Sequence, residues 1–132
     1  QFSYRESIFK QHKNWIILSA VFKLSQDTKE HCEKRMMEML KNKTANQPMG
    51  KYAAGSIFKN PPGFSSWKLI SDAGLRGKQI GKAQISEQHS NYFINTGGAT
   101  AKDMADLIFF AKAEVFKNSG IHLKEEIQYV GF

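Results

Sequence analysis

Apolar and polar positions are grouped into blocks along the chain, and each block has the length of one secondary-structure element. The first, Trp15–Leu24, is a nearly continuous apolar run with β-branched and aromatic members, which predicts a buried strand. The segment Ala54–Gly63 is rich in turn formers and predicts a short strand that stops at a Pro-Pro pair. Short strands are also predicted near Gln84–Ser86, at Tyr92–Asn95 and at Glu126–Val130.

Three other segments have the spacing of amphipathic helices. The first follows Asp27, which is placed to cap it, and the second is short and ends at Gly74. The third follows Thr100 as its cap and ends at Gly120. We expect the apolar face of the first helix to pack in the core, with a groove for a partner as the alternative. The two main apolar faces consist of Cys32, Met36, Met39 and Leu40, and of Met104, Leu107, Ile108, Ala111 and Val115.

The segment Lys41–Ala54 is polar and contains Pro48 and Gly50, which predicts a loop and a boundary between two parts, 1–48 and 49–132. Strands and helices mix without a regular βαβ repeat. We therefore predict the α+β class, with a small mixed or antiparallel sheet and packed helices.

Composition narrows the class of protein. The 132 residues are 41% hydrophobic and 23% charged, which is typical of a globular chain and excludes a disordered one. No apolar run approaches the roughly 20 residues of a membrane span, and the single cysteine, Cys32, excludes an intrachain disulfide. The chain begins at Gln1, so we expect a part of a longer protein.

The net charge of +7 favours an anionic partner such as a phosphorylated small molecule, a nucleic acid or an acidic membrane. The basic residues are spread along the chain and do not alternate with aromatic residues, so nucleic-acid binding is the less favoured interpretation. The four histidines have no metal-ligand spacing. The segment Gly74–Lys82 lacks the phosphate-loop pattern, because Arg76 occupies its first glycine position and Ala83 follows the lysine.

The segment Gly55–Pro61, GSIFKNP, has the strongest chemical character. A serine directly after a glycine in a turn can direct its hydroxyl into a cleft, and Lys59 and Asn60 can donate to an anion. The alternative is a loop with Phe58 as its apolar anchor, in which Ser56 and Asn60 only stabilise turns.

This segment resembles the GS-x-FKNP motif of the UDP-N-acetylenolpyruvoylglucosamine reductase (MurB) family. Four further segments resemble that family's motifs in the same order, so the match is specific although each motif alone is weak. They are Tyr4–Ser7 (YRES), Ala73–Gly77 (AGLRG), His89–Asn95 (HSNYFIN), and Leu123–Ile127 (LKEEI) followed by Gly131.

The resemblance covers the later part of the family's chain. It implies that residues 1–48 are the tail of the FAD-binding domain, and that 49–132 form the UDP-sugar-binding domain. The glycine-rich segments that hold most of the FAD would lie upstream, so the chain alone would be inactive. The implied reaction is the NADPH-dependent, FAD-mediated reduction of UDP-N-acetylglucosamine enolpyruvate to UDP-N-acetylmuramate. That is a cytoplasmic step of peptidoglycan precursor synthesis, on which cell shape and division depend, with no nucleic-acid or membrane partner.

The resemblance also implies the catalytic residues. Ser56 would donate the proton, and Arg5 would bind the substrate carboxylate, for which a guanidinium fork is well suited. Glu126 matches the family's catalytic glutamate. We expect it to carry or share a proton in the assembled site, because an ionised carboxylate would repel the enediolate that forms.

Other residues match positions that contact the UDP-sugar, namely Asn60, Arg76, His89 and Tyr4. Arg76 is placed to meet the diphosphate, with an ordinary surface arginine as the alternative. Some relatives carry a lysine at the position where this chain has Asn46. We therefore assign no phosphate contact to Asn46.

Two rival interpretations stay open. The first is a non-catalytic module that binds nucleotides or nucleic acid through the positive charge, with a steep salt dependence. The second is a structural domain of another flavoprotein, in which Ser56 and Glu126 would lie far apart.

Overall fold

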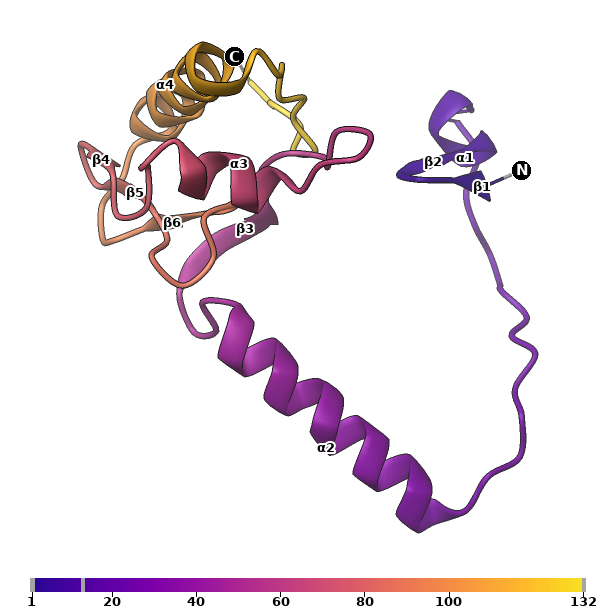
Figure 1. Cartoon of the computed structure of the whole chain (residues 1–132). Helices are drawn as coiled ribbons and strands as arrows, with labels where there is room; N and C mark the ends of the chain where they lie inside the picture. Colours follow the sequence, from indigo (N-terminus) through magenta and orange to yellow (C-terminus); the bar gives the residue numbers. More distant parts are fainter. Residues whose placement is uncertain (1, 13, 132) are drawn as a thin grey trace. The chain divides into compact units, whose positions relative to one another are not determined.

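The computed structural model describes residues 2–12 and 14–131 (Figure 1). The chain separates into two compact units, Gln1–Glu38 and Met39–Phe132. Among the described residues, no helix is both long enough and apolar enough to cross a membrane.

The second unit contains an antiparallel four-stranded sheet in the order β3-β6-β5-β4. Because short polar strands carry little pattern, the sequence missed the two-residue strand β4. The prediction for β6 is confirmed and β5 lies within one residue of its prediction, but the strand predicted within Ala54–Gly63 runs instead from Tyr52 to Ser56. This mixture of helices and antiparallel strands confirms the α+β prediction. The strands are β3 (Tyr52–Ser56), β4 (Gln79–Ile80), β5 (Ala83–Ile85) and β6 (Tyr92–Asn95).

Two helices pack with this sheet. Helix α3 (Ser66–Asp72) is short, and α4 (Ala101–Ser119) packs against α3, β4 and β5. A capping box between Thr100 and Asp103 begins α4, and Gly120 ends it with a left-handed φ of 70°. The Asp103 carboxylate also accepts from the Lys82 N–H at 3.3 Å, which ties the start of α4 to the β4–β5 turn. The predicted cap and end of this helix are therefore confirmed.

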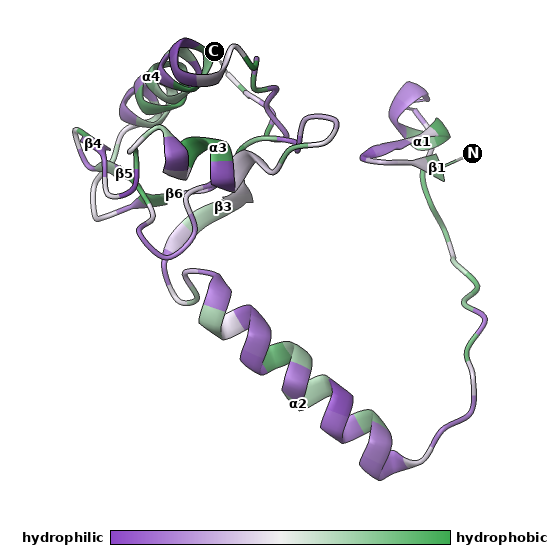
Figure 2. Ribbon diagram, in the orientation of Figure 1, coloured by the Kyte–Doolittle hydropathy of each residue, from purple (hydrophilic) through white to green (hydrophobic). Residues whose placement is uncertain are grey.

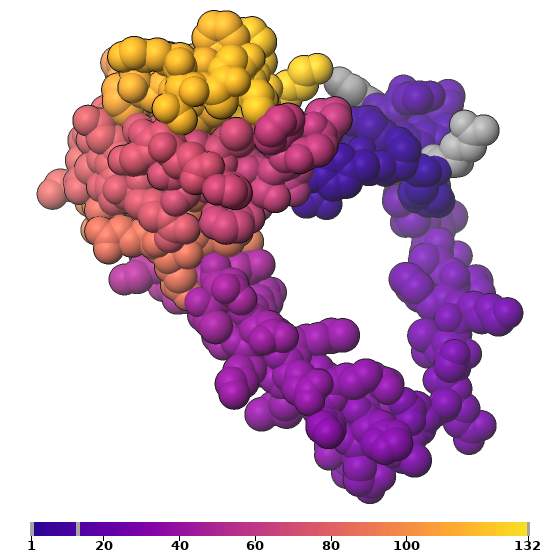
Figure 3. Space-filling view, viewed as in Figure 1, coloured from indigo at the N-terminus to yellow at the C-terminus, as the bar shows by residue number. Residues whose placement is uncertain are grey.

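The core lies between α4, α3 and the sheet. In the space-filling view the yellow atoms near the end of the chain lie directly against the pink atoms from the middle of the chain (Figure 3). Four of the five predicted apolar positions of α4 are buried, and Met104 packs against them half-buried. The largest fully buried side chains include Ile57, Phe58, Ile70, Ile85, Phe93, Leu107, Ile108, Val115 and Leu123.

The predicted strand Glu126–Val130 is wrong. The closing segment makes one isolated antiparallel bridge, between Phe58 and Glu125, and then continues without regular structure. Val130 is 86% exposed. The alternating pattern was present, but a strand also needs a neighbouring backbone along its length, and here the pairing covers only one residue pair.

The predicted strand Trp15–Leu24 is also absent. The first unit contains β1 (Phe2–Ser3), β2 (Glu6–Ser7) and α1 (Ile8–Gln11), and the apolar run has no regular structure. Its side chains are exposed, with Val21 at 99%. Figure 2 draws the segment between α1 and α2 as a thin irregular tube that is green in part, the colour of hydrophobic residues. Within the described ranges 2–12 and 14–131 no strand pairs with this run, so its apolar pattern is not realised as a sheet.

Helix α2 (Lys29–Asn46) differs from the prediction in three ways. It extends through 41–46, where a loop was expected, and the side chain of Gln88 donates to the carbonyls of Thr44 and Ala45 at 2.9 Å each. Its N-terminal cap is Thr28, whose hydroxyl accepts from the His31 N–H at 3.3 Å, whereas Asp27 bonds to Thr28 and Arg35.

The third difference concerns the expected core face of α2. None of the residues of this helix is buried, and Met36 and Met39 are 61% and 69% exposed. The helical period is correct, but burial needs a second surface, and none of the described elements supplies one to this stripe.

Candidate functional site

Ser56 lies at the end of β3, at a distortion of the sheet. The pairing of β3 with β6 shifts register between Ala53 and Ser56, and Gly55 has a φ of 91°, a left-handed conformation that favours glycine. Ser56 is half-buried. The bulge turns the chain from the strand into the loop that carries Lys59 and Asn60.

Buried Asn91 fixes the residues that follow Ser56. Its carboxamide accepts from the Phe58 N–H at 2.9 Å and donates to the Phe58 carbonyl at 2.8 Å. Its own carbonyl accepts from the Ile57 N–H at 2.8 Å. Because both backbone groups of Phe58 are satisfied by one side chain, the turn after Ser56 is held in a single geometry.

The closing segment lies directly beside this turn. The Lys59 N–H donates to the Lys124 carbonyl at 2.9 Å, and the Glu126 N–H donates to the Ile57 carbonyl at 2.8 Å. Ser56 and half-buried Glu126 are therefore brought alongside one another from opposite ends of the second unit. This is the juxtaposition that the rival interpretation of an unrelated structural domain would lack.

Asn60 has a structural task in this loop. Its side-chain oxygen accepts from the Ser66 N–H at 2.9 Å, at the start of α3, while the Ser66 hydroxyl donates to the Lys59 carbonyl at 2.6 Å. Neither contact could be predicted from the sequence, which placed the cap of α3 at Ser65 or Ser66. The loop after Ser56 is thus tied to α3 as well as to β6.

Arg76 and His89 line one hollow of about 400 Å³. The Arg76 guanidinium is oriented by two bonds, from Nε to the Ser71 hydroxyl at 2.8 Å and from Nη1 to the Glu87 carbonyl. The sequence pointed to Arg76 and His89 but not to Trp67 and Gln88, which also line the hollow. Asn46, to which the sequence assigned no phosphate contact, is the fifth lining residue. The Arg76 guanidinium and the Trp67 indole ring together suit an anionic, ring-bearing ligand, whereas the amide nitrogens of Asn46 and Gln88 donate to backbone carbonyls of α2.

The His89 ring is held among aromatic side chains. Its centroid lies 4.9 Å from that of Tyr92 and 6.3 Å from that of Trp67. Nδ1 accepts from the Asn91 N–H at 3.3 Å, so the neutral ring carries its proton on Nε2. Burial lowers the pKa of His89. A hydrogen bond with its own backbone partly opposes this shift, and the positive charge of Arg76 adds a smaller lowering of the pKa.

This lowered pKa predicts acid sensitivity. Because the unfolded state binds the proton more readily, the fold should lose stability as the pH falls through the ordinary value of 6.5 and below. His89→Asn keeps an acceptor near Asn91 and cannot titrate. We expect its melting temperature to fall less than that of the unmodified protein between pH 7.5 and pH 5.5, roughly the range of histidine titration.

The matched control is His122→Asn, since His122 is exposed and stacks on Phe116 with centroids 4.1 Å apart. This variant should keep the full pH dependence of the melting temperature. If His89→Asn and His122→Asn change the dependence equally, the assignment to His89 fails.

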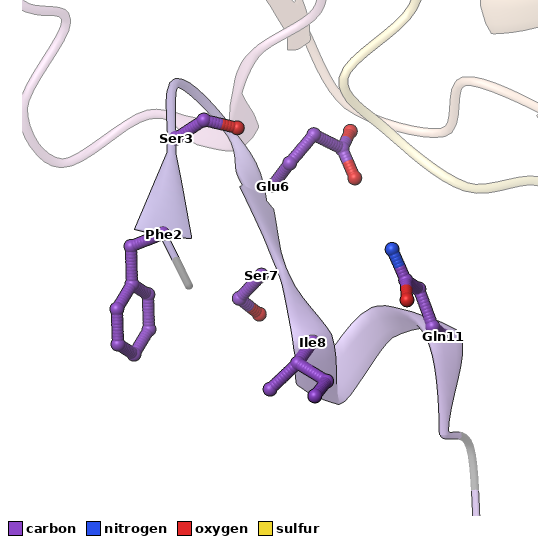
Figure 4. A pocket seen from close by; sticks show the side chains of 6 residues that line it. All are labelled: Phe2, Ser3, Glu6, Ser7, Ile8 and Gln11. Carbon is purple, nitrogen blue, oxygen red and sulfur yellow. The ribbon is translucent and has the colours of Figure 1, made fainter.

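Tyr4 and Arg5 lie in the turn of the β1–β2 hairpin in the first unit. Arg5 has a φ of 59°, and its guanidinium carbon lies 5.2 Å from the centre of the Tyr4 ring. Both are exposed. Beside the hairpin is a separate hollow of about 450 Å³, shown in Figure 4 and lined by Phe2, Ser3, Glu6, Ser7, Ile8 and Gln11.

The motifs that carry these groups can be compared with known families. Residues 47–130 match the family described as UDP-N-acetylenolpyruvoylglucosamine reductase, C-terminal domain. The chain belongs to this family. The match covers the whole sheet, α3, α4 and the closing bridge, and thus every site residue assigned to the second unit except Asn46.

Individual relatives agree with the family match. A UDP-N-acetylenolpyruvoylglucosamine reductase from Rickettsia felis is 48% identical over 119 residues, which are 90% of this chain and 40% of that protein. One from Caldanaerobacter subterraneus is 44% identical and matches 99% of this chain and 43% of its own length. The chain therefore spans about two-fifths of these relatives.

A solved structure shows the same arrangement. The crystal structure of UDP-N-acetylenolpyruvylglucosamine reductase (MurB) from Thermus caldophilus is 38% identical, with a TM-score of 0.66. The likeness covers 80% of this chain and 37% of the other. The MurB resemblance predicted from the motifs is thus confirmed.

Proposed function

We propose that this chain is the later part of a reductase that converts UDP-N-acetylglucosamine enolpyruvate to UDP-N-acetylmuramate in peptidoglycan precursor synthesis. Family membership supports the reaction class. The observation that best supports the proposed site is the hydrogen bond from the Glu126 N–H to the Ile57 carbonyl, because it joins the backbone at Glu126 to the turn after Ser56. We propose residues 49–132 as the substrate-binding domain, 1–48 as the tail of the FAD-binding domain, and the cytoplasm as the location.

Reduction of the enolpyruvyl double bond adds a hydride to one carbon and a proton to the other, and negative charge develops on the carboxylate side between these additions. In the proposal Ser56 donates the proton, which a hydroxyl does only to a strongly basic carbanion. Glu126 carries a proton that stabilises the developing charge, and Arg5 binds the carboxylate through its fixed fork of donors. Because Asn91 fixes the backbone of Phe58, the turn that carries Ser56 does not need to reorganise when the reaction occurs.

The hollow with Arg76 and His89 is proposed to receive the UDP part of the substrate. Arg76 is already oriented by Ser71 and Glu87, so little side-chain freedom is lost when it meets the diphosphate. Neutral His89 offers its Nε2–H as a donor, and Trp67 offers an apolar ring. We also assign Asn60 and Tyr4 to substrate contacts.

In this proposal FAD, reduced by NADPH, supplies the hydride. Neither of the two hollows described above is lined by a glycine, whereas a dinucleotide pyrophosphate is usually held by glycine-rich backbone. These two hollows therefore do not fit the dinucleotide, and we propose that most of its contacts lie in the part of the relatives that this chain does not span.

The direct test uses the full-length protein that contains this chain. Purified protein should oxidise NADPH only when UDP-N-acetylglucosamine enolpyruvate is present, and the product should be UDP-N-acetylmuramate by mass spectrometry. Binding of RNA or DNA with a steep salt dependence, without any reaction of the UDP-sugar, would instead favour the nucleic-acid-binding alternative.

Arg76 gives a test of the UDP-binding hollow. Arg76→Met removes a charged donor, and such bonds contribute about 1.5–3 kcal/mol, so KM for the UDP-substrate should rise roughly tenfold to hundredfold. The maximal rate should change less, because Arg76 is proposed to bind the UDP part of the substrate and not the enolpyruvyl group that reacts. Steady-state kinetics of the full-length protein measures both values.

The matched control is Lys78→Met, a neighbouring exposed cation that lies over the Phe110 ring at 4.8 Å. It should leave KM nearly unchanged. Equal effects of the two variants would mean that only the general positive charge matters.

A further inference from the structure

An ion pair joins α4 to the closing segment of the chain. Lys112 Nζ lies 2.7 Å from Glu125 Oε1, and the two side chains are only 32% and 21% exposed. By contrast, the pairs Lys68–Asp72 and Lys102–Asp106 each join residues four apart on one helix. The Lys112–Glu125 pair therefore connects two segments whose relative position no local rule determines.

The closing segment depends on such side-chain contacts because it lacks a strand ladder. Its backbone is held to the Ser56 turn at the bridge between Phe58 and Glu125, by the bonds of Lys59 and Glu126 on either side. Before the bridge, buried Leu123 anchors the segment in the core. At the bridge itself, the charged partner of Glu125 is Lys112 on α4.

We propose that Lys112 and Glu125 form a positioning pair that holds Glu126 against the Ser56 turn. Glu125 directly precedes Glu126. When the ion pair holds the Glu125 carboxylate against α4, it therefore also restricts the position of Glu126 after the bridge. Partial burial strengthens this hydrogen bond between charges relative to one in water. The link to catalysis rests on the role proposed above for Glu126, whereas the positioning itself does not.

The test measures hydrogen–deuterium exchange in the full-length protein, on peptides that cover the turn at 56–59 and the segment 121–131. Lys112→Met and Glu125→Gln should each accelerate exchange there by roughly tenfold, the loss expected for one charged hydrogen bond. The double variant Lys112→Glu with Glu125→Lys should restore slow exchange, because it reverses the pair and keeps its length. Lys102→Met, on the same helix, is the matched control and should leave this exchange unchanged.

Exchange that stays slow in both single variants would overturn the proposal, as would fast exchange in the reversed pair. The same proteins are then assayed for the reaction with UDP-N-acetylglucosamine enolpyruvate. The single variants should lower kcat more than they raise KM, and the reversed pair should recover it. Fast exchange with unchanged kcat would support the positioning pair and would instead refute the catalytic role of Glu126.

Discussion

Ser56→Ala in the full-length protein is expected to slow the reduction of UDP-N-acetylglucosamine enolpyruvate by about a hundredfold to ten-thousandfold, the usual contribution of a positioned proton donor. The variant removes the hydroxyl only, since the turn is held by Asn91 through the backbone of Ile57 and Phe58. Substrate binding should therefore change little. Rapid-mixing absorbance of the flavin separates the two half-reactions.

Only the half-reaction with the UDP-substrate should be affected, while reduction by NADPH stays fast. Ser65→Ala is the matched control, because Ser65 is also half-buried, precedes α3 and makes no side-chain cap bond. It should react normally in both half-reactions. A Ser56→Ala protein that is slowed equally in both would show that the hydroxyl is not the proton donor.

Asn91→Leu should cause the largest loss of stability. Asn91 is 4% exposed, and its carboxamide satisfies both backbone groups of Phe58, which is itself 1% exposed. A leucine of similar size would leave a buried donor and a buried acceptor without partners. We expect the free energy of unfolding to fall by about 3 kcal/mol and the melting temperature by about 10 °C.

Calorimetry or circular dichroism measures this loss, and Asn118→Leu is the control, since Asn118 is exposed near the end of α4. That variant should shift the melting temperature by only about 1–2 °C. The variant Asn91→Leu should also lower the rate of substrate reduction at temperatures where it is still folded, because the turn that carries Ser56 loosens. An unchanged melting temperature would mean that water replaces the carboxamide.

The sequence predictions were correct where the signal depended only on residues close together in the chain. Helix α4 was predicted with its cap, its buried face and its end, because capping, helical period and a left-handed glycine all act within a few residues. The apolar run Trp15–Leu24 and the segment Glu126–Val130 had equally clear strand patterns. Neither forms a strand, because strand formation depends on a distant partner backbone that the pattern does not contain.

In the candidate site, too, local motifs identified the residues, whereas the contacts between them depend on the fold. The motifs singled out Ser56, Glu126, Arg76 and His89, but not the contacts that orient them. Asn91 was hidden inside a motif as a polar strand residue, although a buried asparagine beside a turn is a common way to satisfy backbone groups. Trp67 and Gln88 had no signal of their own, since they matter only through the hollow that they share with Arg76.

By itself, the sequence determined the α+β class, the MurB family and the short list of reactive side chains, because motifs and local periods depend on neighbours along the chain. The tertiary structure alone decided that Glu126 lies beside the Ser56 turn, that Arg76 and His89 share one hollow, and that Lys112 reaches Glu125. These are contacts between residues far apart in sequence, and folding decides them by satisfying buried backbone groups and charges that no local pattern records.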